Sequence, residues 1–176
     1  MLFPRYLIVI ILFMLAGCKD LTPSSSDERP DLDCGISGSG VCQVAPDFSL
    51  FNTLRNPLTM SSELVGADGI VLYFTMWCPL CNLHTDDMIA DVIPNFPNVK
   101  FFLIDYVSGT ISQAYITQNS YGYDSMTVLV DEIQHVYDLY NAAMGTAVVI
   151  DNAGIVQMNE DYKDGTKLTQ TLTALP

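Results

Sequence analysis

Positively charged residues and histidines are scarce in this sequence. Its 7 lysines and arginines stand against 20 aspartates and glutamates, and the formal net charge is −13. A surface with that charge repels nucleic acid, so we expect no nucleic-acid partner. With only 2 histidines, the chain also lacks the ligands for a zinc finger, and no bound cofactor is expected.

Residues 1–17 hold an apolar run that is too short for a comfortable membrane span. A short basic start precedes the run and small residues follow it, which is the layout of a secretory signal peptide. The run ends in Leu-Ala-Gly-Cys at residues 15–18, which resembles a bacterial lipobox, so we expect cleavage before Cys18 and its lipidation. The mature chain would then be lipid-anchored in the bacterial cell envelope, facing the periplasm or the cell exterior. An ordinary signal peptide or an uncleaved anchor is the alternative.

Residues 18–43 contain few apolar residues and many of Ser, Asp, Pro and Gly, so we expect a flexible tether. Cys34 and Cys42 lie in this segment. We interpret them as a structural disulfide that closes a Gly/Ser loop in an oxidising compartment. A second redox pair is the alternative. With Cys18 lipidated, the other four cysteines form two pairs, Cys34 with Cys42 and a pair within the WCPLC segment.

Residues 44–176 show short apolar runs that alternate with helical patterns. Hydrophobic residues make up 49% of the chain, enough for a sizeable core. The runs predict a β-hairpin from 47–51 and 58–60, strands at 69–75, 99–106, 126–131, 145–151 and 155–158, and helices at 61–66, 79–96, 110–122, 132–141 and 164–175. This alternation predicts an α/β domain with a mixed central sheet flanked by helices and preceded by the hairpin.

The segment FTMWCPLCNLH places two cysteines where the first buried strand meets its helix. Cys78 falls at the helix start, where free backbone N–H groups stabilise a thiolate, the nucleophile of disulfide exchange. Cys81 follows on the same helical face and is expected to be more buried, which suits a resolving thiol. Pro79 stiffens the loop at a position whose N–H would be unpaired. Trp77 is expected to shield the couple and to offer partners an apolar contact.

Two other uses of this segment fit less well. Haem attachment needs a histidine directly after the second cysteine, but Asn82 stands there. Thr75 and Cys78 match the Thr-x-x-Cys letters of a peroxide-reducing thiol. However, the peroxiredoxin family places proline four residues before that threonine, and here this residue is Val71. We interpret the match as a coincidence.

The stretches DFSL, WCPLC, VLVD and VVIDNAGIVQ together resemble a thioredoxin-fold domain of the TlpA/ResA type. Proteins of this family are membrane-tethered thiol–disulfide oxidoreductases of the bacterial envelope. The resemblance covers residues 44–176 and implies that Cys78 attacks a partner disulfide and that Cys81 resolves the mixed disulfide. It also implies envelope proteins with disulfides or thiols as partners, reduction as the direction, and a membrane thiol-transfer donor that recharges the couple.

Two positions depart from the family pattern. Where the family has a cis-proline, this chain has Gly145, after Met144. The docking of partners, expected at Trp77, Pro79, Met144 and Gly145, would therefore be altered. His84 stands where the family carries a glutamate that is thought to manage the proton of the resolving thiol. A neutral imidazole could do the same. Alternatively, His84 is a partly exposed helix residue without a role.

The same departures leave a metal-binding alternative open. Cys78, Cys81 and His84 form a C-x-x-C-x-x-H pattern whose soft thiolates and imidazole suit Cu(I) or zinc. Helix geometry turns the histidine partly away from Cys78, which disfavours that use.

Polar and aromatic residues outside the dithiol segment have simpler interpretations. Asp105, Asp131 and Asp151 each end an apolar strand, so we expect them to cap strand ends. Tyr121 and Tyr123 lie in a glycine-containing loop and could line a docking surface.

Overall fold

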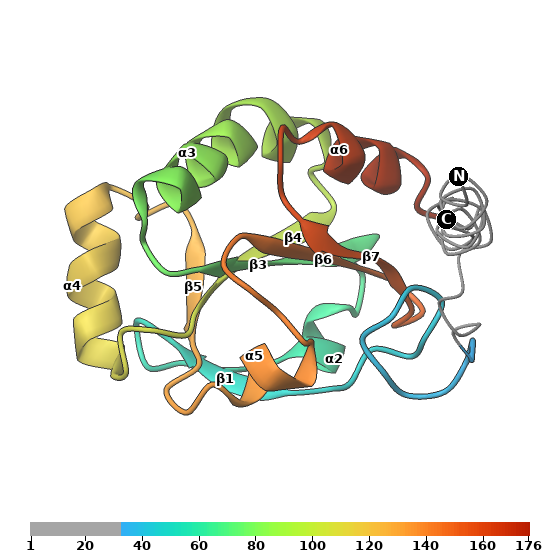
Figure 1. The fold of residues 1–176 in the computed structure, drawn as a ribbon, viewed down its shortest axis with the longest axis horizontal. Helices are drawn as coiled ribbons and strands as arrows, with labels where there is room; N and C mark the ends of the chain where they lie inside the picture. Colours follow the sequence, from blue (N-terminus) through green and yellow to red (C-terminus); the bar gives the residue numbers. More distant parts are fainter. Residues whose placement is uncertain (1–32) are drawn as a thin grey trace, which may run out of the picture. The chain divides into compact units, whose positions relative to one another are not determined.

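The computed structural model describes residues 33–176, so the predicted signal peptide and the lipidation of Cys18 lie outside the described residues. A seven-stranded sheet has the strand order β2-β1-β5-β4-β3-β6-β7 (Figure 1). The strands are β1 (Ser49–Asn52), β2 (Pro57–Thr59), β3 (Gly69–Thr75), β4 (Val99–Asp105), β5 (Thr127–Val130), β6 (Thr146–Asp151) and β7 (Val156–Asp161). The helices are α2 (Met60–Glu63), α3 (Pro79–Asp87), α4 (Ile111–Tyr121), α5 (His135–Leu139) and α6 (Thr166–Thr173).

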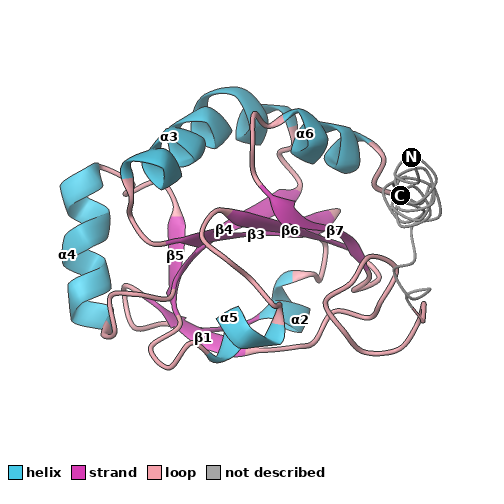
Figure 2. Ribbon diagram, viewed as in Figure 1, coloured by secondary structure: helices cyan, strands magenta, loops and turns pink. Residues whose placement is uncertain are grey.

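The sheet is mixed, as the sequence predicts. Strand β4 pairs in parallel with β3 and β5, whereas β6 pairs antiparallel with β3, and β7 antiparallel with β6. The predicted hairpin of β1 and β2 forms and extends the sheet through antiparallel pairing of β1 with β5. Helices α3 and α6 lie over one face, and α2 and α5 lie over the other (Figure 2). The predicted α/β fold is confirmed.

The central strand β3 is buried along its whole length and supplies both faces of the sheet. Its side chains alternate between the faces. Val71 and Tyr73 join the core under α3 and α6, which also contains Met88 and Leu168. The alternate residues Ile70, Leu72 and Phe74 join the core on the side of α5, with Val136 and Tyr140. A strand buried on both faces reads as a continuous apolar run, which explains why the sequence predicts it well.

The helix predicted over 79–96 is shorter and is not a single α-helix. After α3 the chain continues through a π-helical turn, η1 (Met88–Val92), and a 3-10 turn, η2 (Ile93–Asn95). Pro94 lies within η2 and has no N–H to continue an α-helical ladder, so the regular helix stops before it. In the described part of the chain, no helix is long and apolar enough to cross a membrane.

Aspartates at strand ends cap the turns that follow, as predicted. Asp105 Oδ1 accepts hydrogen bonds from two backbone N–H groups of the next turn. Asp131 accepts two at the start of α5, and Asp151 accepts two in the β6–β7 turn. These bonds place the carboxylates in structural roles.

Residues 33–43, predicted to belong to a flexible tether, are instead bound to the domain. The Cys42 N–H donates to the Val156 carbonyl at 2.8 Å, and the Val156 N–H donates to the Gln43 carbonyl at 2.9 Å. The Asn159 side-chain amide donates to the Ser39 carbonyl at 2.9 Å. Strand β7 is an edge of the sheet with unpaired backbone groups, which this loop partly covers.

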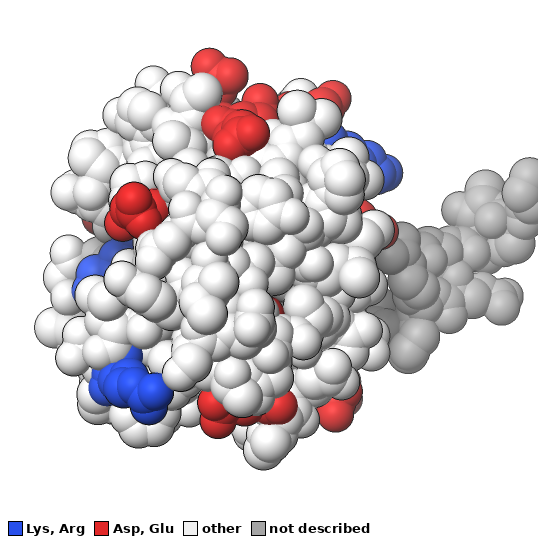
Figure 3. Space-filling view, turned by 90° about the vertical axis from the view of Figure 1, so that its left-hand side faces the viewer, with Lys and Arg blue, Asp and Glu red and all other residues white. Residues whose placement is uncertain are grey.

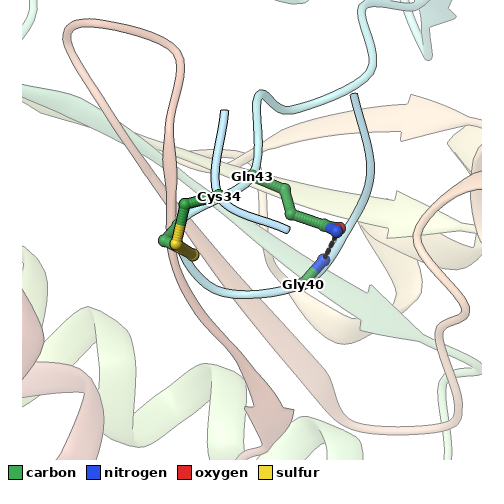
Figure 4. Close-up of a disulfide and its surroundings, with 4 residues drawn as sticks. Cys34, Gly40 and Gln43 are labelled. Carbon is green, nitrogen blue, oxygen red and sulfur yellow. Dashed lines mark hydrogen bonds between the residues drawn. A yellow bond between two sulfur atoms is a disulfide. The ribbon is translucent and has the colours of Figure 1, made fainter. Parts of the chain in front are cut away.

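A disulfide between Cys34 and Cys42 closes this loop (Figure 4). Inside it, the Gly40 N–H donates to the side-chain oxygen of Gln43 at 2.9 Å. The cross-link and the bonds to β7 together fix the entry of the chain into the domain.

Removing the disulfide is expected to destabilise the domain. Loss of a cross-link with a sequence separation of 8 raises the entropy of the unfolded chain. The double variant Cys34→Ser/Cys42→Ser should therefore lose about 2.5 kcal/mol of unfolding free energy. Urea unfolding under non-reducing conditions measures the loss. An unchanged unfolding midpoint would show that the loop does not hold the domain together.

A core substitution on β4 is expected to cost more. Leu103 is fully buried, so Leu103→Ala should lower the unfolding free energy by about 2–5 kcal/mol because it leaves a cavity. Leu54 is 66% exposed, and Leu54→Ala is the matched control, with little change expected. Equal losses for both variants in urea unfolding would contradict the assigned burial.

Candidate active site

The turn between β3 and α3 determines where the dithiol lies. Trp77 adopts a left-handed backbone conformation with φ of 60°, which is uncommon for a residue with a side chain. Its N–H donates to the Thr75 hydroxyl at 3.1 Å. The next residue, Cys78, is the N-cap of α3, and Pro79 occupies the first turn. The Thr75 hydroxyl is thus engaged within the turn.

The two cysteines are free thiols with different environments. Their sulfur atoms lie 2.7 Å apart, and the Cys81 N–H donates to the Cys78 sulfur at 3.1 Å. Cys78 is half-buried, whereas Cys81 is 1% exposed. One thiol can therefore meet a partner, and the other can reach the first thiol from inside.

Hydrogen bonding and burial separate the acidities of the two thiols. Burial opposes ionisation of Cys78. Hydrogen bonds from the Cys81 thiol and from backbone N–H groups at the helix start nevertheless lower the pKa of Cys78. Burial, followed by the hydrogen bond with Cys78, raises the pKa of Cys81. Cys78 is therefore the more readily ionised of the two thiols.

Trp77 does not offer partners the apolar contact that the sequence predicts. Its side chain is only 8% exposed, because the Tyr121 ring stacks on it at 6.0 Å between centroids. The Tyr121 hydroxyl donates to the Trp77 carbonyl at 3.2 Å, and Tyr123 stacks on the indole at 6.4 Å. Tyr121, 46% exposed, therefore takes the outward position, and Trp77 supports the turn from inside.

Exposed apolar side chains surround the dithiol segment, and two of them were not among the predicted docking residues. Met76 is 42% exposed and Leu80 is 50% exposed, on either side of Cys78 along the chain. The thioether sulfur of Met144, itself 43% exposed, lies 3.5 Å from the Cys78 sulfur. Figure 3 shows that large areas of the molecular face toward α4 carry no charged side chain. Exposed methionines and leucines beside a reactive cysteine are a signal that composition alone does not reveal.

Gly145 replaces the expected cis-proline with a different backbone conformation. Its φ is 81°, which proline cannot adopt, and residues 33–176 contain no cis peptide bond. The Gly145 N–H donates to the Phe74 carbonyl at 2.9 Å, and the Gly145 carbonyl accepts from the Tyr162 N–H at 2.8 Å. Both backbone groups of this residue are therefore engaged within the domain.

His84 is buried, so its interpretation as a partly exposed helix residue is wrong. Only 6% of the residue is exposed, because α3 packs this side of its second turn against β3. The imidazole Nδ1 lies 2.9 Å from the Tyr73 hydroxyl, and the Tyr162 ring lies 4.7 Å from the imidazole between centroids. Burial lowers the pKa of His84, although the nearby Asp87 carboxylate opposes that effect. Burial thus favours the neutral form of the imidazole.

A cavity of about 270 Å³ adjoins the buried thiol. Its lining includes Cys81, Tyr73, His84, Gly145 and Tyr162. A side chain at position 145 would project into this space, since an added Cβ would lie 3.7 Å from the Tyr73 hydroxyl and 3.9 Å from His84 Nδ1. Glycine thus leaves the contact between tyrosine and histidine facing the cavity. No motif in the sequence points to Tyr73 or Tyr162.

The metal-binding alternative gains no support from this geometry. Across residues 33–176, no group of three or more His, Cys, Asp or Glu side chains is arranged to hold a metal ion. One ring nitrogen of His84 faces the Tyr73 hydroxyl rather than the two sulfurs.

Alkylation should separate the two thiols. In the intact protein, Cys78 is expected to react with iodoacetamide at lower pH than an ordinary cysteine, because its pKa is lowered. In Cys81→Ala the thiol donor is lost, so the pH midpoint for alkylating Cys78 should rise. It should still stay below that of the urea-unfolded chain, because the backbone N–H groups remain. Mass spectrometry of the Cys78 peptide measures both midpoints, and coincident midpoints for the folded and unfolded chains would contradict the assigned stabilisation.

Comparisons with known proteins agree with this fold. The family model described as the AhpC/TSA family matches residues 41–159, and no curated protein has a sequence that matches this chain. A putative thiol:disulfide interchange protein DsbE from Chlorobium tepidum is 21% identical with a TM-score of 0.64, covering 74% of this chain and 94% of that one.

Two structures from Mycobacterium tuberculosis are also similar. A secreted disulfide oxidoreductase homologous to E. coli DsbE has 22% identity and a TM-score of 0.58, covering 73% of this chain and 96% of that one. The peroxidoxin BcpB has 21% identity and a TM-score of 0.60, covering 76% and 96%. At these identities the structures establish the fold, and the family model covers more than half of the chain. The chain therefore belongs to the AhpC/TSA family and is a thioredoxin-like oxidoreductase.

Proposed function

We propose that the chain is a thiol–disulfide oxidoreductase of the bacterial envelope that exchanges disulfides with protein partners. The observation that carries this proposal is the pair of free thiols at the start of α3, with sulfurs 2.7 Å apart. One thiol has a lowered pKa and is accessible, and the other has a raised pKa and is buried. That asymmetry suits a nucleophile and a resolving thiol.

The reaction proceeds in two exchanges. The Cys78 thiolate attacks one sulfur of the partner disulfide, forming a mixed disulfide and releasing the other partner sulfur as a thiolate. Cys81 then loses its proton and attacks the Cys78 sulfur, so the internal disulfide forms and the second partner thiolate leaves. Two electrons pass from the chain to the partner, whose two thiolates take up protons. His84 is proposed as the acceptor of the Cys81 proton.

Reduction of partners is the direction that the surroundings of the thiolate favour. Within residues 33–176, the Cys78 sulfur interacts with the Cys81 thiol, with backbone N–H groups at the start of α3 and with the Met144 thioether, and none of these groups carries a positive charge. A thiolate without a cationic partner is stabilised less. The dithiol form is therefore stabilised less relative to the disulfide form. The reduction potential of the couple is correspondingly lower, and the couple gives up electrons more readily.

Partners are proposed to dock through side chains around Cys78 rather than through the backbone of Gly145. The backbone N–H and carbonyl of Gly145 already bond within the domain. Met144 and Leu80 offer exposed apolar surface next to the reactive sulfur, and Pro79 keeps the loop between them stiff. A partner cysteine flanked by apolar residues in an extended or locally unfolded segment fits this surface.

The proposed location is the outer side of a bacterial membrane, with Cys18 lipidated after removal of residues 1–17. The Cys34–Cys42 disulfide supports an oxidising compartment. One structurally similar protein is described as secreted. A membrane thiol-transfer protein is the proposed donor that returns the Cys78–Cys81 disulfide to the dithiol.

A redox titration of the full chain tests this function. Differential alkylation followed by mass spectrometry reads the Cys78–Cys81 couple separately from Cys34–Cys42. We expect a reversible two-electron transition near or below about −270 mV, the range of a thioredoxin-like reductant. Cys78→Ser, the control variant, should abolish the transition.

Two other results would change the proposal. A midpoint near about −120 mV would reverse the direction and assign an oxidant. No reversible transition at all would overturn the oxidoreductase function.

A further inference from the structure

His84 makes no hydrogen bond with Cys81 among the described residues, but Tyr73 lies beside both. The Tyr73 hydroxyl lies 2.9 Å from His84 Nδ1. Tyr73 and Cys81 also line the same cavity. Tyr73 belongs to the central strand β3 and is 1% exposed, so packing holds its ring in place at this cavity.

We propose that Tyr73 is a catalytic residue that carries the proton of Cys81 to His84 during resolution of the mixed disulfide, an inference that rests on the exchange reaction proposed above. In this step Tyr73 receives the proton of the reacting thiol directly, whereas His84 acts through Tyr73 and also positions its hydroxyl. No motif in the sequence connects these two residues, because they lie eleven positions apart on different elements.

The transfer is balanced without a charged tyrosine. In the mixed disulfide, Cys78 is no longer a thiolate that accepts from Cys81. In this scheme the Cys81 S–H then donates to the Tyr73 oxygen, and the Tyr73 O–H donates to Nδ1 of a neutral imidazole protonated at Nε2. As Cys81 attacks the Cys78 sulfur, its proton passes to the tyrosine oxygen and the tyrosine proton passes to Nδ1. The products are the internal disulfide, the departing thiolate and an imidazolium, which returns its extra proton to water.

Burial makes a two-step transfer through free tyrosinate costly. The pKa of Tyr73 is raised well above its ordinary value, first by burial and then by the neighbouring Cys81 and Cys78. The hydroxyl therefore keeps a proton at all times and exchanges one for another. The lowered pKa of His84 keeps the imidazole ready to accept at neutral pH.

Other charged and titratable groups around the imidazole affect its proton affinity. From α3, the Asp87 carboxylate favours the imidazolium, and its Oδ2 accepts a hydrogen bond from the Tyr162 hydroxyl. Asp161 and Lys163, at the end of β7, line the same cavity. The effects of these two opposite charges on the imidazolium oppose each other. Asp87 is therefore the main group that stabilises the transient imidazolium.

The cavity gives the proton a route out of the core. Because Gly145 has no side chain, the Tyr73–His84 contact borders a space of about 270 Å³. A cavity of this size holds water molecules when polar groups line it, and the tyrosine hydroxyls and the imidazole supply such groups. In this scheme, the residue that replaces the family's proline keeps the proton exit open.

The reaction of the reduced full chain with 5,5′-dithiobis(2-nitrobenzoate), a small aromatic disulfide, tests the relay. The aromatic thiolate leaves without taking up a proton, so the rate of each release does not depend on protonation of the leaving group. The released thiolate is coloured, which makes each release visible. With protein in excess, the first release reports attack by Cys78. The second reports attack by Cys81 on the mixed disulfide. Stopped-flow absorbance separates the two phases.

We expect Tyr73→Phe to slow only the second phase, by about 100-fold, the lower end of what a positioned proton acceptor contributes. His84→Gln should slow it by a similar factor. The double variant should be no slower than either single variant, because both changes break one path. In Tyr73→Phe the second phase should also become proportional to hydroxide concentration, a change that a purely structural role would not produce.

Tyr140→Phe is the matched control. Tyr140 is also fully buried and hydrogen-bonded, but it lies in the core on the opposite face of the sheet. Tyr140→Phe also removes a buried hydroxyl, but it should leave the rates of both phases unchanged.

Each result decides between the relay and its rivals. A normal second phase in Tyr73→Phe, or slowing by His84→Gln alone, would overturn the relay and leave the exchange function intact. Independent, multiplying effects in the double variant would overturn it as well. Loss of the first phase in the unmodified chain would overturn the proposed function itself.

Discussion

The active site depends on one turn, in which a fully buried strand must stop and a helix must start within three residues. Trp77 accepts an unfavourable left-handed backbone, stabilised by the Thr75 hydroxyl and by the tyrosine rings stacked on its indole. That turn directs Cys78 outward as the helix cap and places Cys81 beneath it. Packing of the aromatic side chains therefore sets the geometry of the sulfur chemistry.

The same arrangement explains why two identical side chains differ chemically. Backbone N–H groups at the first turn of α3 and the Cys81 thiol together lower the pKa of Cys78, whereas burial outweighs the backbone hydrogen bonds to Cys81 and raises its pKa. The core that orders β3 also removes Cys81 from water. A buried thiol that ionises in the proposed cycle needs a proton acceptor close by, and Tyr73 of β3 lines the same cavity as that thiol.

Local patterns in the sequence were sufficient for the fold and for the dithiol. Continuous apolar runs identify β3 and β4, and a proline after a cysteine identifies the start of α3. Contacts between distant elements were not predictable in this way. The Tyr73–His84 bond depends on how α3 packs on β3, and the burial of Trp77 depends on the rings of Tyr121 and Tyr123.

If Cys18 carries the proposed lipid, the bonded loop at residues 33–43 limits how far the domain can lie from the membrane. Only the chain between Cys18 and Asp33 would then connect the lipid to the domain. A chain of that length spans at most about 50 Å, compared with about 90 Å for a connection that ended at Val44. The reactive sulfur would then stay within a short distance of the bilayer surface. Proteins held at that surface would meet it often, and freely diffusing ones would meet it seldom.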